Sequence, residues 1–289
     1  MDEERSDNSP LVSIVLPVHN GARYLRESVD SCLRQTHRNW ELIVVNDGST
    51  DETEEIVLSY RDPRIVYDRH HPNAGLPRSL NVGFALARGQ YLTWTSDDNR
   101  YADEALEVMV AELERSAPRV QFVYADCHLI DETGQVTGLS EGKAPARLRE
   151  ENVVGACFLY TAAVAAAVGP YHPEVKLAED YEYWLRVLYR FGMRRIPRPL
   201  YYYRQHGESL SARYGWPFVL QVARQARASA RAGLPWYQRC WESTVRSPRL
   251  SVMQRRCVAA VEEALRPRRR LQQLREARDQ RKAGGNGEG

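Results

Sequence analysis

The chain has 289 residues, of which 43% are hydrophobic and 27% charged, a balance typical of a globular protein rather than a disordered or fibrous one. The length fits one domain of roughly 200 to 250 residues with an appendage. Five cysteines, an odd number without CxxC spacing, indicate neither a disulfide framework nor a zinc site, and they favour a reducing compartment.

The two ends of the chain bear on location and partners. The first ten residues, MDEERSDNSP, are acidic and polar, unlike a signal peptide. The longest apolar stretch, near residues 162–168, falls well short of the roughly 18 residues that a spanning helix needs. From Arg246 onward the chain carries 12 basic and 5 acidic residues, a local charge of +7. We therefore expect a cytoplasmic protein. Its basic C-terminal end is either a solvated helical face or a binding surface, and such a surface would contact anionic lipid at the inner face of the membrane, an acidic partner or nucleic acid.

Apolar runs alternate with amphipathic segments through the first 125 residues. Five runs are predicted to be strands, at residues 11–18, 40–45, 64–67, 90–95 and 120–125. The intervening helices are predicted at residues 22–35, 49–60, 76–88 and 102–115. Ser49 and Glu52 have the spacing of a capping box, and Gly89 is a predicted C-cap.

Strands that alternate with helices of this length predict an α/β fold with a mostly parallel sheet flanked by helices on both faces. Ligands of such sheets bind beyond the carboxyl ends of the strands. Three polar loops follow predicted strands: PVHN at 17–20, NDGS at 46–49 and SDDN at 96–99. We expect these three loops to form a site.

The second half of the chain is less regular. We expect an irregular segment at 131–146, an apolar segment at 152–160, a helix at 161–168, a second helix at 178–191 that Gly192 ends, and a short strand at 200–203. Beyond residue 216 the pattern is helical and arginine-rich as far as the GGNGEG tail. Trp184 and tyrosines 201–203 have two interpretations, as aromatic core residues or as platforms on which a sugar stacks.

Asp97 and Asp98 stand side by side at the end of a predicted strand. Adjacent acids in a polar loop can simply be solvated, but carboxylate oxygens are also preferred ligands of divalent cations. The first half contains no GxGxxG, GxxxxGK[ST] or GxSxG motif, which argues against a dinucleotide fold, a P-loop NTPase and the common serine hydrolases. Carboxylates and small polar residues around a cleft suit an anionic ligand held through a metal.

Several motifs together resemble family 2 glycosyltransferases, which have the Rossmann-like GT-A fold. They are VSIVLPVHNGARYLRESVDSCLRQTHRNWELIVVNDGSTDET, NAGLPRSLNVGFALARGQYLTWTSDDN, AEDYEYWLRV and YYYRQHGESLS, in that order. The resemblance covers about residues 11–211. It implies a GT-A domain at 11–212, with a nucleotide-binding half at 11–125 and an acceptor-binding half at 126–212. A flexible leader at 1–10, a basic helical C-terminal extension at 213–282 and a disordered tail at 283–289 complete the predicted organisation.

The resemblance also assigns roles to donor-site residues. It implies that Asp47 binds the nucleotide base and that Pro17, Val18 and Asn20 form the wall of the base pocket. Arg78 approaches the diphosphate. The segment at 96–98 matches the DXD motif, so that Asp98 ligates Mn²⁺ or Mg²⁺ and Asp97 binds the ribose or sugar. Most relatives have an acid where this chain has Asn46, which removes one charge near the nucleotide.

The acceptor side depends on the helix at 178–191. By position Asp180 matches the catalytic base of the family, and the positive end of the helix is expected to favour its ionised form. The alternative is that Glu179 and Asp180 only cap this helix, Glu179 being the more structural of the two. His206 is a candidate further metal ligand, or else an exposed loop histidine. His19, His70, His71 and His128 receive no role.

The resemblance implies an inverting transferase that moves a single sugar, because the QxxRW motif and the membrane spans of processive synthases are absent from the sequence. The expected donor is a nucleoside-diphosphate sugar, UDP-linked by preference, and the acceptor is a glycan, a lipid-linked molecule or a small molecule. A homo-oligomer is a further expectation for the C-terminal helices, and nucleic acid is the least favoured partner. Two alternatives stay open: a nucleotidyltransferase, disfavoured because PVHNGARY lacks lysine, and a catalytically weak module that binds nucleotide-sugar or docks on a membrane or nucleic acid.

Overall fold

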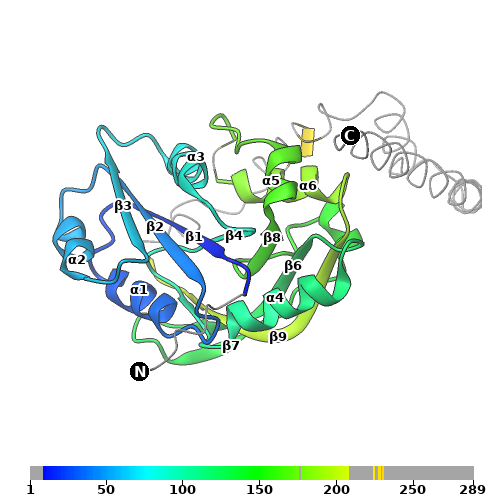
Figure 1. Ribbon diagram of the computed structural model, residues 1–289, viewed down its shortest axis with the longest axis horizontal. Helices are drawn as coiled ribbons and strands as arrows, with labels where there is room; N and C mark the ends of the chain where they lie inside the picture. The colour runs from blue at the N-terminus through cyan, green and yellow to red at the C-terminus, as the bar shows by residue number, and fades with distance from the viewer. Residues whose placement is uncertain (1–8, 176, 208–223, 225–226, 229, 231–289) are drawn as a thin grey trace, which may run out of the picture. The chain divides into compact units, whose positions relative to one another are not determined.

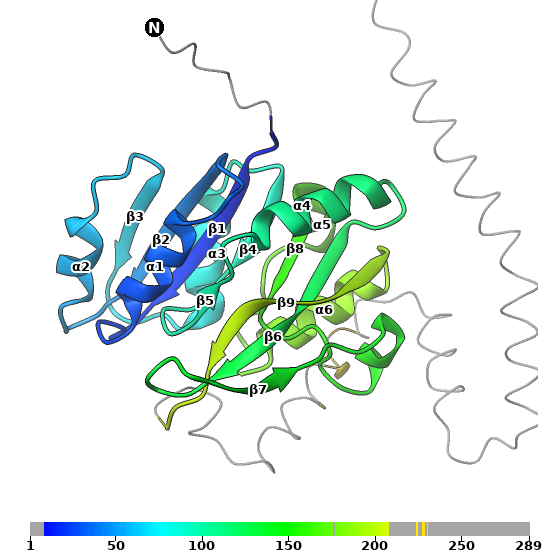
Figure 2. The ribbon, with the colours of Figure 1, turned by 90° about the horizontal axis from the view of Figure 1, so that it is seen from below.

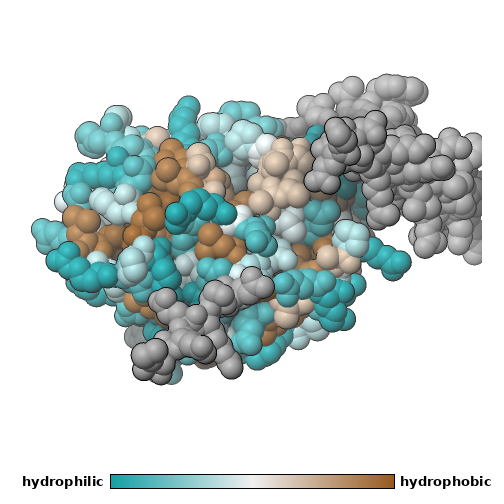
Figure 3. Space-filling view, viewed as in Figure 1, coloured by the Kyte–Doolittle hydropathy of each residue, from teal (hydrophilic) through white to brown (hydrophobic). Residues whose placement is uncertain are grey.

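The computed structural model describes residues 9–175, 177–207, 224, 227–228 and 230. The predictions for the first eight residues, for nearly all of 213–282 and for the 283–289 tail lie outside the described residues, although the four described positions beyond 207 are helical. Within the described part of the chain, no helix has both the length and the apolar character needed to cross a membrane. Hydrophobic areas on the face shown in Figure 3 are small and separated by hydrophilic side chains.

The first half of the chain builds a parallel sheet. Its strands lie in the order β3-β2-β1-β4 and are β1 (Val12–Val18), β2 (Trp40–Asp47), β3 (Ile65–His70) and β4 (Tyr91–Trp94). β1 and β2 are buried along their whole length, and a strand covered on both faces has the continuous apolar pattern that predicts it. Because these strands run the same way, their carboxyl ends meet at one edge of the sheet.

The second half continues the same sheet with mixed pairing (Figure 2). It contributes β5 (Arg100–Tyr101), β6 (Phe122–Ile130), β7 (Val136–Ser140), β8 (Phe158–Thr161) and β9 (Met193–Arg204). The order continues as β4-β8-β6-β9-β5, with β7 on β6. Here β6 and β9 are parallel, while the other pairs are antiparallel. The prediction of an α/β fold with flanking helices is confirmed, and the sheet is parallel in its first half and mixed in its second.

Helices cover both faces of the sheet (Figure 1). One face packs against α1 (Leu25–Leu33), α2 (Thr53–Ser59) and α4 (Ala105–Ser116). The other face packs against α3 (Leu76–Leu86), α5 (Ala162–Val168) and α6 (Glu179–Leu188). A short 3-10 helix, η1 (Pro145–Arg149), lies in the segment predicted to be irregular.

Two predicted helix signals are wrong. Ser49 does not cap α2, because its hydroxyl accepts the N–H of Asn20 at 3.0 Å, whereas Asp51 accepts the N–H of Thr53 at 3.1 Å. Gly89 does not cap α3, which ends at Leu86 and is followed by the C-cap residue Ala87 in an extended conformation. A Cβ on Gly89 would lie 2.6 Å from the backbone nitrogen of Ser13, so this glycine permits close packing against β1.

Helix and strand boundaries differ most near β5 and β9. The predicted helix at 102–115 begins later, at Ala105, because the N–H of Ala102 bonds to the carbonyl of Leu200 in β9. The helix predicted at 178–191 ends at Leu188, before Gly192. A Cβ on Gly192 would overlap the carbonyl of Arg119, which explains a glycine at this position without any capping role.

Two of the aromatic residues predicted as core or ligand platforms, Trp184 and Tyr201, form core, whereas Tyr202 and Tyr203 are only partly buried. Trp184 is fully buried, with its ring centroid 4.5 Å from that of Phe158 and 4.9 Å from that of Phe122. Tyr201 is also buried and makes an edge contact with Tyr101 at 5.0 Å. Side chains without exposed surface cannot stack on a sugar, so that interpretation is wrong for Trp184 and Tyr201.

Candidate functional site

The three polar loops predicted to form a site are tied to one another at the carboxyl edge of the parallel strands. Asn20, in the left-handed region with φ of 55°, links the first two loops because its side-chain oxygen accepts the N–H of Thr50 at 2.8 Å. The hydroxyl of Ser28 on α1 donates to the carbonyl of Ser96 in the third loop at 2.8 Å. Pro17 and Val18 are buried at the end of β1, so a ligand of the site would meet their backbone atoms rather than their side chains.

Asp47 is buried at the end of β2, where its carboxylate holds the loop between β3 and α3. Oδ1 accepts the N–H of Ala74 at 2.6 Å and contacts Nε2 of His70 at 2.7 Å, while Oδ2 accepts the N–H of Gly75 at 2.9 Å. Since a carboxylate oxygen can accept about two hydrogen bonds, Oδ2 retains one acceptor position. Asp47 can therefore hold its own loop and still accept one N–H from a ligand.

Asn46 has a structural reason to be an amide. Its NH₂ donates to the hydroxyl of Tyr67 at 2.9 Å, and its oxygen accepts the N–H of Ser49 at 2.9 Å. The Tyr67 hydroxyl in turn donates to Glu54 at 3.1 Å. An aspartate at position 46 would compete with Glu54 for the single proton of Tyr67, so the amide suits this buried chain of hydrogen bonds.

Asp97 lies against the backbone of Gly21. Burial, reinforced by the charge of Asp98, raises the pKa of Asp97 to about 7. A Cβ on Gly21 would overlap the Asp97 carboxylate and lie 2.6 Å from Cγ2 of Val18. The position between the first and third loops therefore requires a glycine.

We expect Gly21→Ala to destabilise the protein, because the added methyl group displaces Asp97. Overpacking of this kind costs about 1–3 kcal/mol of unfolding free energy, measurable by urea denaturation. Gly138→Ala is the matched control, since a Cβ there meets only Cδ1 of Leu129, at an ordinary 3.6 Å. Equal stability of the two variants would show that Asp97 does not depend on Gly21.

Asp98 and His206 are brought together although 108 positions separate them in the sequence. Nε2 of His206 lies 3.0 Å from Oδ2 of Asp98, while Oδ1 accepts the hydroxyl of Ser96 at 2.6 Å. The side chain of His206 is 8% exposed, so it is not the exposed loop histidine of the alternative interpretation. A carboxylate and an imidazole in contact are a donor pair suited to a divalent cation such as Mn²⁺.

This pair contains two donors, and the described residues include no group of three or more histidine, cysteine or acidic side chains arranged to hold a metal. A divalent cation prefers four to six ligands, so a cation here would take its other ligands from water or from a bound substrate. The Asp98–His206 pair fits a cation that arrives with a diphosphate.

Arg204 fixes this pair, and the sequence did not single it out. Its side chain is fully buried, with Nε donating to the carbonyl of Asp98 at 2.9 Å and Nη2 paired with Glu27 at 2.7 Å. The guanidinium lies over the ring of Tyr24, 4.3 Å from its centroid. Its backbone N–H also donates to the side chain of Asn99, at 2.7 Å. Arg204 thus holds the 96–99 loop and β9 in one position.

Asp180 and Glu179 are the first two residues of α6, after the N-cap Ala178, which makes no side-chain hydrogen bond. Asp180 accepts an N–H of the first turn, so it contributes to the end of the helix as the capping alternative expects. Oδ1 of Asp180 accepts the N–H of Tyr181 at 2.6 Å, and Oδ2 accepts the amide of Asn152 at 3.0 Å. Oε2 of Glu179 is buried and has no hydrogen-bond partner among the residues that the structure describes.

The protonation of this acidic pair differs from the expectation. Burial raises the pKa of Asp180, and burial with the charge of Asp180 raises the pKa of Glu179 to about 7. We expected the helix end to favour ionisation, but burial outweighs it here. The half-buried Asp180 is therefore a stronger proton acceptor than an ordinary aspartate.

A chain of contacts connects the 96–99 loop to α6. Trp94, at the end of β4, donates from its indole nitrogen to the hydroxyl of Tyr171 at 3.2 Å. The ring of Tyr171 stacks on that of Tyr183 in α6, with centroids 4.3 Å apart. Arg78 stands apart from this chain: it is exposed on the first turn of α3, and its guanidinium donates to the carbonyl of Ala74 at 3.3 Å.

The sequence is similar to a known family of proteins. Residues 13–158 match the family described as glycosyl transferase family 2. The chain belongs to this family. An uncharacterized glycosyltransferase of Rickettsia typhi is 35% identical over 192 residues, which cover 62% of this chain and 59% of that protein. The putative colanic acid biosynthesis glycosyl transferase WcaA of Escherichia coli K12 is 30% identical over 195 residues, covering 64% of this chain and 68% of WcaA.

The fold has a solved counterpart. The crystal structure of residues 1–349 of S. aureus TarS in complex with UDP-GlcNAc matches with a TM-score of 0.65 and 20% identity, covering 80% of this chain and 69% of TarS 1–349. The described domain therefore has the GT-A fold. The chain spans about 59% of the length of the Rickettsia typhi relative.

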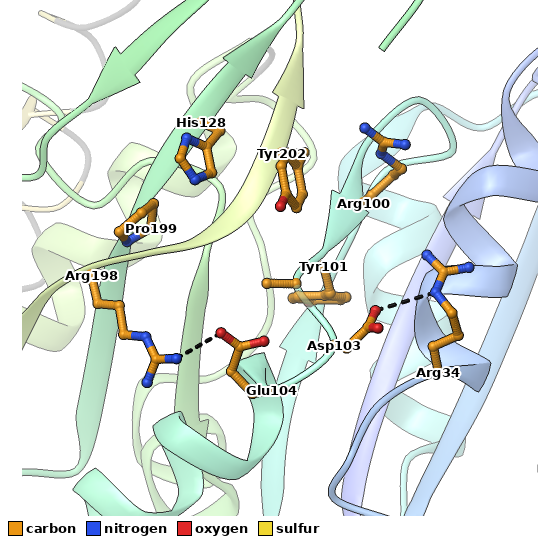
Figure 4. Close-up of a pocket in the computed structure, with 10 residues that line it drawn as sticks. Arg34, Arg100, Tyr101, Asp103, Glu104, His128, Arg198, Pro199 and Tyr202 are labelled. Atoms are coloured by element: carbon orange, nitrogen blue, oxygen red, sulfur yellow. Dashed lines mark hydrogen bonds and ion pairs between the residues drawn. The ribbon is translucent and has the colours of Figure 1, made fainter. Parts of the chain in front are cut away.

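One cavity of this family 2 domain lies elsewhere. It has a volume of about 600 Å³ and lies among the residues shown in Figure 4, which include Arg34, Arg100, Arg198 and His128. Arg34 and Arg198 are paired with acids of the same cavity, Asp103 at 3.2 Å and Glu104 at 2.7 Å. Tyr202, one of the tyrosines predicted as possible sugar platforms, lines this cavity, but none of the residues predicted to bind the nucleotide or the metal does, and neither does Asp180, so it is not the candidate donor site.

Proposed function

We propose that this protein transfers a single sugar from a nucleoside-diphosphate sugar, UDP-linked, to an acceptor hydroxyl with inversion at the anomeric carbon. The observation that carries the proposal is the contact between Asp98 and His206 at 3.0 Å, built at the carboxyl edge of the sheet where the loop of Asp47 also ends. Family membership supports a transferase, and the fold matches a TarS structure in complex with UDP-GlcNAc.

The free acceptor position on Asp47 indicates which bases suit the site. Uracil, thymine and guanine carry a ring N–H beside a carbonyl, and this N–H can donate to the carboxylate, whereas the ring nitrogen of cytosine at this place only accepts and the donor of cytosine is its exocyclic amino group. A cytosine bound in the position of uracil would place a lone pair against the buried, negatively charged Asp47, an arrangement that costs at least the lost hydrogen bond. Asp47 therefore favours UDP, dTDP or GDP over CDP.

Asp98 and His206 would hold Mn²⁺ or Mg²⁺ together with the diphosphate. The bound cation would stabilise the negative charge that develops on the leaving phosphate oxygen. Arg78 is exposed next to the loop that Asp47 holds, and it can add charge-assisted hydrogen bonds to the same phosphates once a ligand draws it inward. Asp97 would bind the ribose or the sugar.

Asp180 would accept the proton of the attacking hydroxyl. Among the described residues, the N–H of Tyr181 bonds to one of its oxygens and the amide of Asn152 to the other, and a carboxylate oxygen can accept about two hydrogen bonds, so a position for that hydroxyl remains. Its raised pKa suits a base that works near neutral pH. A base that acts on the acceptor while the diphosphate leaves implies a single in-line displacement, and hence inversion.

Calorimetric titration of UDP, dTDP, GDP and CDP into the protein with Mn²⁺ tests the donor site. We expect UDP to bind about tenfold or more tightly than CDP, because the lost hydrogen bond to Asp47 and an unsatisfied charge together cost about 1.5–3 kcal/mol. Repeating the titration in EDTA should abolish tight binding.

Equal affinity for UDP and CDP would show that Asp47 does not bind the base. Binding that survives EDTA would remove the cation from the proposal. No binding of any of these nucleotides would contradict the donor site as a whole and favour the alternative of a module that docks elsewhere.

A further inference from the structure

The side-chain amide of Asn152 lies between Asp180 and Val154 and has a defined orientation. Oδ1 accepts the backbone N–H of Val154 at 3.3 Å, and only the oxygen of an amide can accept an N–H. The NH₂ group must therefore be the part that faces Asp180, where Nδ2 lies 3.0 Å from Oδ2.

The segment that carries Asn152 is attached firmly to its surroundings. Val153 and Val154 are buried in the core on the α6 side of the sheet. The hydroxyl of Tyr181 on α6 donates to the carbonyl of Leu148 at 2.8 Å, which joins this segment to the helix that begins with Asp180. The donor group of Asn152 is thus held in place on a rigid support.

Opposing influences act on the charge of Asp180. Burial and the acidic neighbour Glu179 favour its neutral form. Tyr171, which lies near Asp180 in the segment before α6, is a neutral phenol and brings no positive charge that would oppose this effect. The N–H of Tyr181 and the amide of Asn152 favour the ionised form. Among the described residues, Asn152 is the side chain bonded to the Asp180 carboxylate.

We propose that Asn152 is a positioning residue for the base: its amide fixes the direction of the Asp180 carboxylate and favours the ionised form. The inference rests on the proposed function in so far as it takes Asp180 to be the base. Because Oδ2 receives the Asn152 amide and Oδ1 the N–H of Tyr181, the remaining acceptor positions of the carboxylate point in fixed directions toward an acceptor hydroxyl.

The test measures the Asp180 carboxyl directly, by ¹³C NMR titration of protein labelled at aspartate carboxyl carbons, with Asp180→Asn identifying the signal. We expect Asn152→Ala to raise the pKa of Asp180 by about one unit, the effect of losing one hydrogen bond to the charged form. Asn152→Asp should raise it further, because a second carboxylate then faces Asp180. An unchanged titration in both variants would overturn the proposal.

Asn39→Ala is the matched control. Asn39 also bridges two segments, because its amide donates to the carbonyl of Ser9 at 2.6 Å, but it directly precedes β2, at the amino end of that strand. This variant should leave the pKa of Asp180 unchanged. With a UDP-sugar that the wild-type protein uses, the acid limb of the pH–rate profile should move upward by the same amount as the NMR pKa, with UDP affinity retained.

The two readouts separate two kinds of failure. A shifted Asp180 titration in a protein that transfers no sugar from any UDP-sugar would retain the positioning contact and contradict the proposed function. Turnover that falls equally in Asn152→Ala and Asn39→Ala, without movement of the pH profile, would show that Asn152 only supports the fold.

Discussion

Asp98→Asn is expected to lower sugar transfer about 10³-fold in the presence of saturating Mn²⁺. The substitution keeps the size of the side chain and an oxygen that can accept the Ser96 hydroxyl, but it removes the charge that faces His206 at 3.0 Å. A metal that stabilises a leaving diphosphate is worth several kcal/mol, and about 4 kcal/mol corresponds to that loss of rate. Steady-state rates across a Mn²⁺ titration measure the change.

Asp103→Asn provides the matched control for Asp98→Asn. Asp103 is an exposed acid five residues farther along the chain, where it pairs with Arg34 at 3.2 Å, and the same substitution there should leave UDP binding and turnover intact. His206→Ala should also weaken Mn²⁺-dependent binding of UDP, because it removes the second donor. Full activity of Asp98→Asn would show that this carboxylate is not a metal ligand.

The donor side of the site could be predicted from sequence because its residues follow buried strands. A fully buried parallel strand gives an unbroken apolar run, and the residue after that run must lie at the carboxyl edge of the sheet. This rule places the loops of Asp47 and Asp98 at that edge, whereas the roles of the two residues were assigned through the family resemblance. His70 could have been found as well, since it lies opposite Asp47 in the parallel register of β2 and β3.

The strands β7 and most of β9 in the second half were not predicted, for physical reasons. β9 contains Pro197 and Pro199, which interrupt a strand pattern, and its pairing with β6 is irregular around Asp126. β7 is an exposed edge strand with Gly138 in its middle, so it lacks the buried alternation that predicts a strand. Mixed pairing of such strands depends on contacts between distant segments, which a local pattern does not contain.

Arg204 and Asn152 show why the remainder of the site needs coordinates. Arg204 contacts Glu27, 177 positions earlier, and Asn152 contacts Asp180, 28 positions later. An arginine in a tyrosine-rich strand and an asparagine in a loop carry no local signal of these partners. Asp180 itself was assigned through the family resemblance, and the expected reason for its ionisation was wrong, because burial dominates over the helix end.

Asp180→Asn is expected to reduce transfer about 10³-fold while UDP still binds with Mn²⁺. The amide retains the shape of the side chain and can still accept the N–H of Tyr181, but it cannot take a proton from an acceptor hydroxyl. Loss of general base catalysis costs about 10²- to 10⁴-fold in rate. Calorimetry of UDP binding beside a transfer assay separates loss of chemistry from loss of the donor site.

Glu179→Gln decides which of the two acids is the base. Burial and the charge of Asp180 raise the pKa of Glu179 to about 7, so the two carboxylates repel each other when both are ionised. Replacing the Glu179 carboxylate by an amide removes this repulsion and lowers the pKa of Asp180. A base must be deprotonated to act, so the activity of Glu179→Gln should persist to lower pH than that of the wild-type protein. If Glu179→Gln is inactive and Asp180→Asn retains turnover, the two roles are reversed, and the buried Oε2 of Glu179 is the proton acceptor.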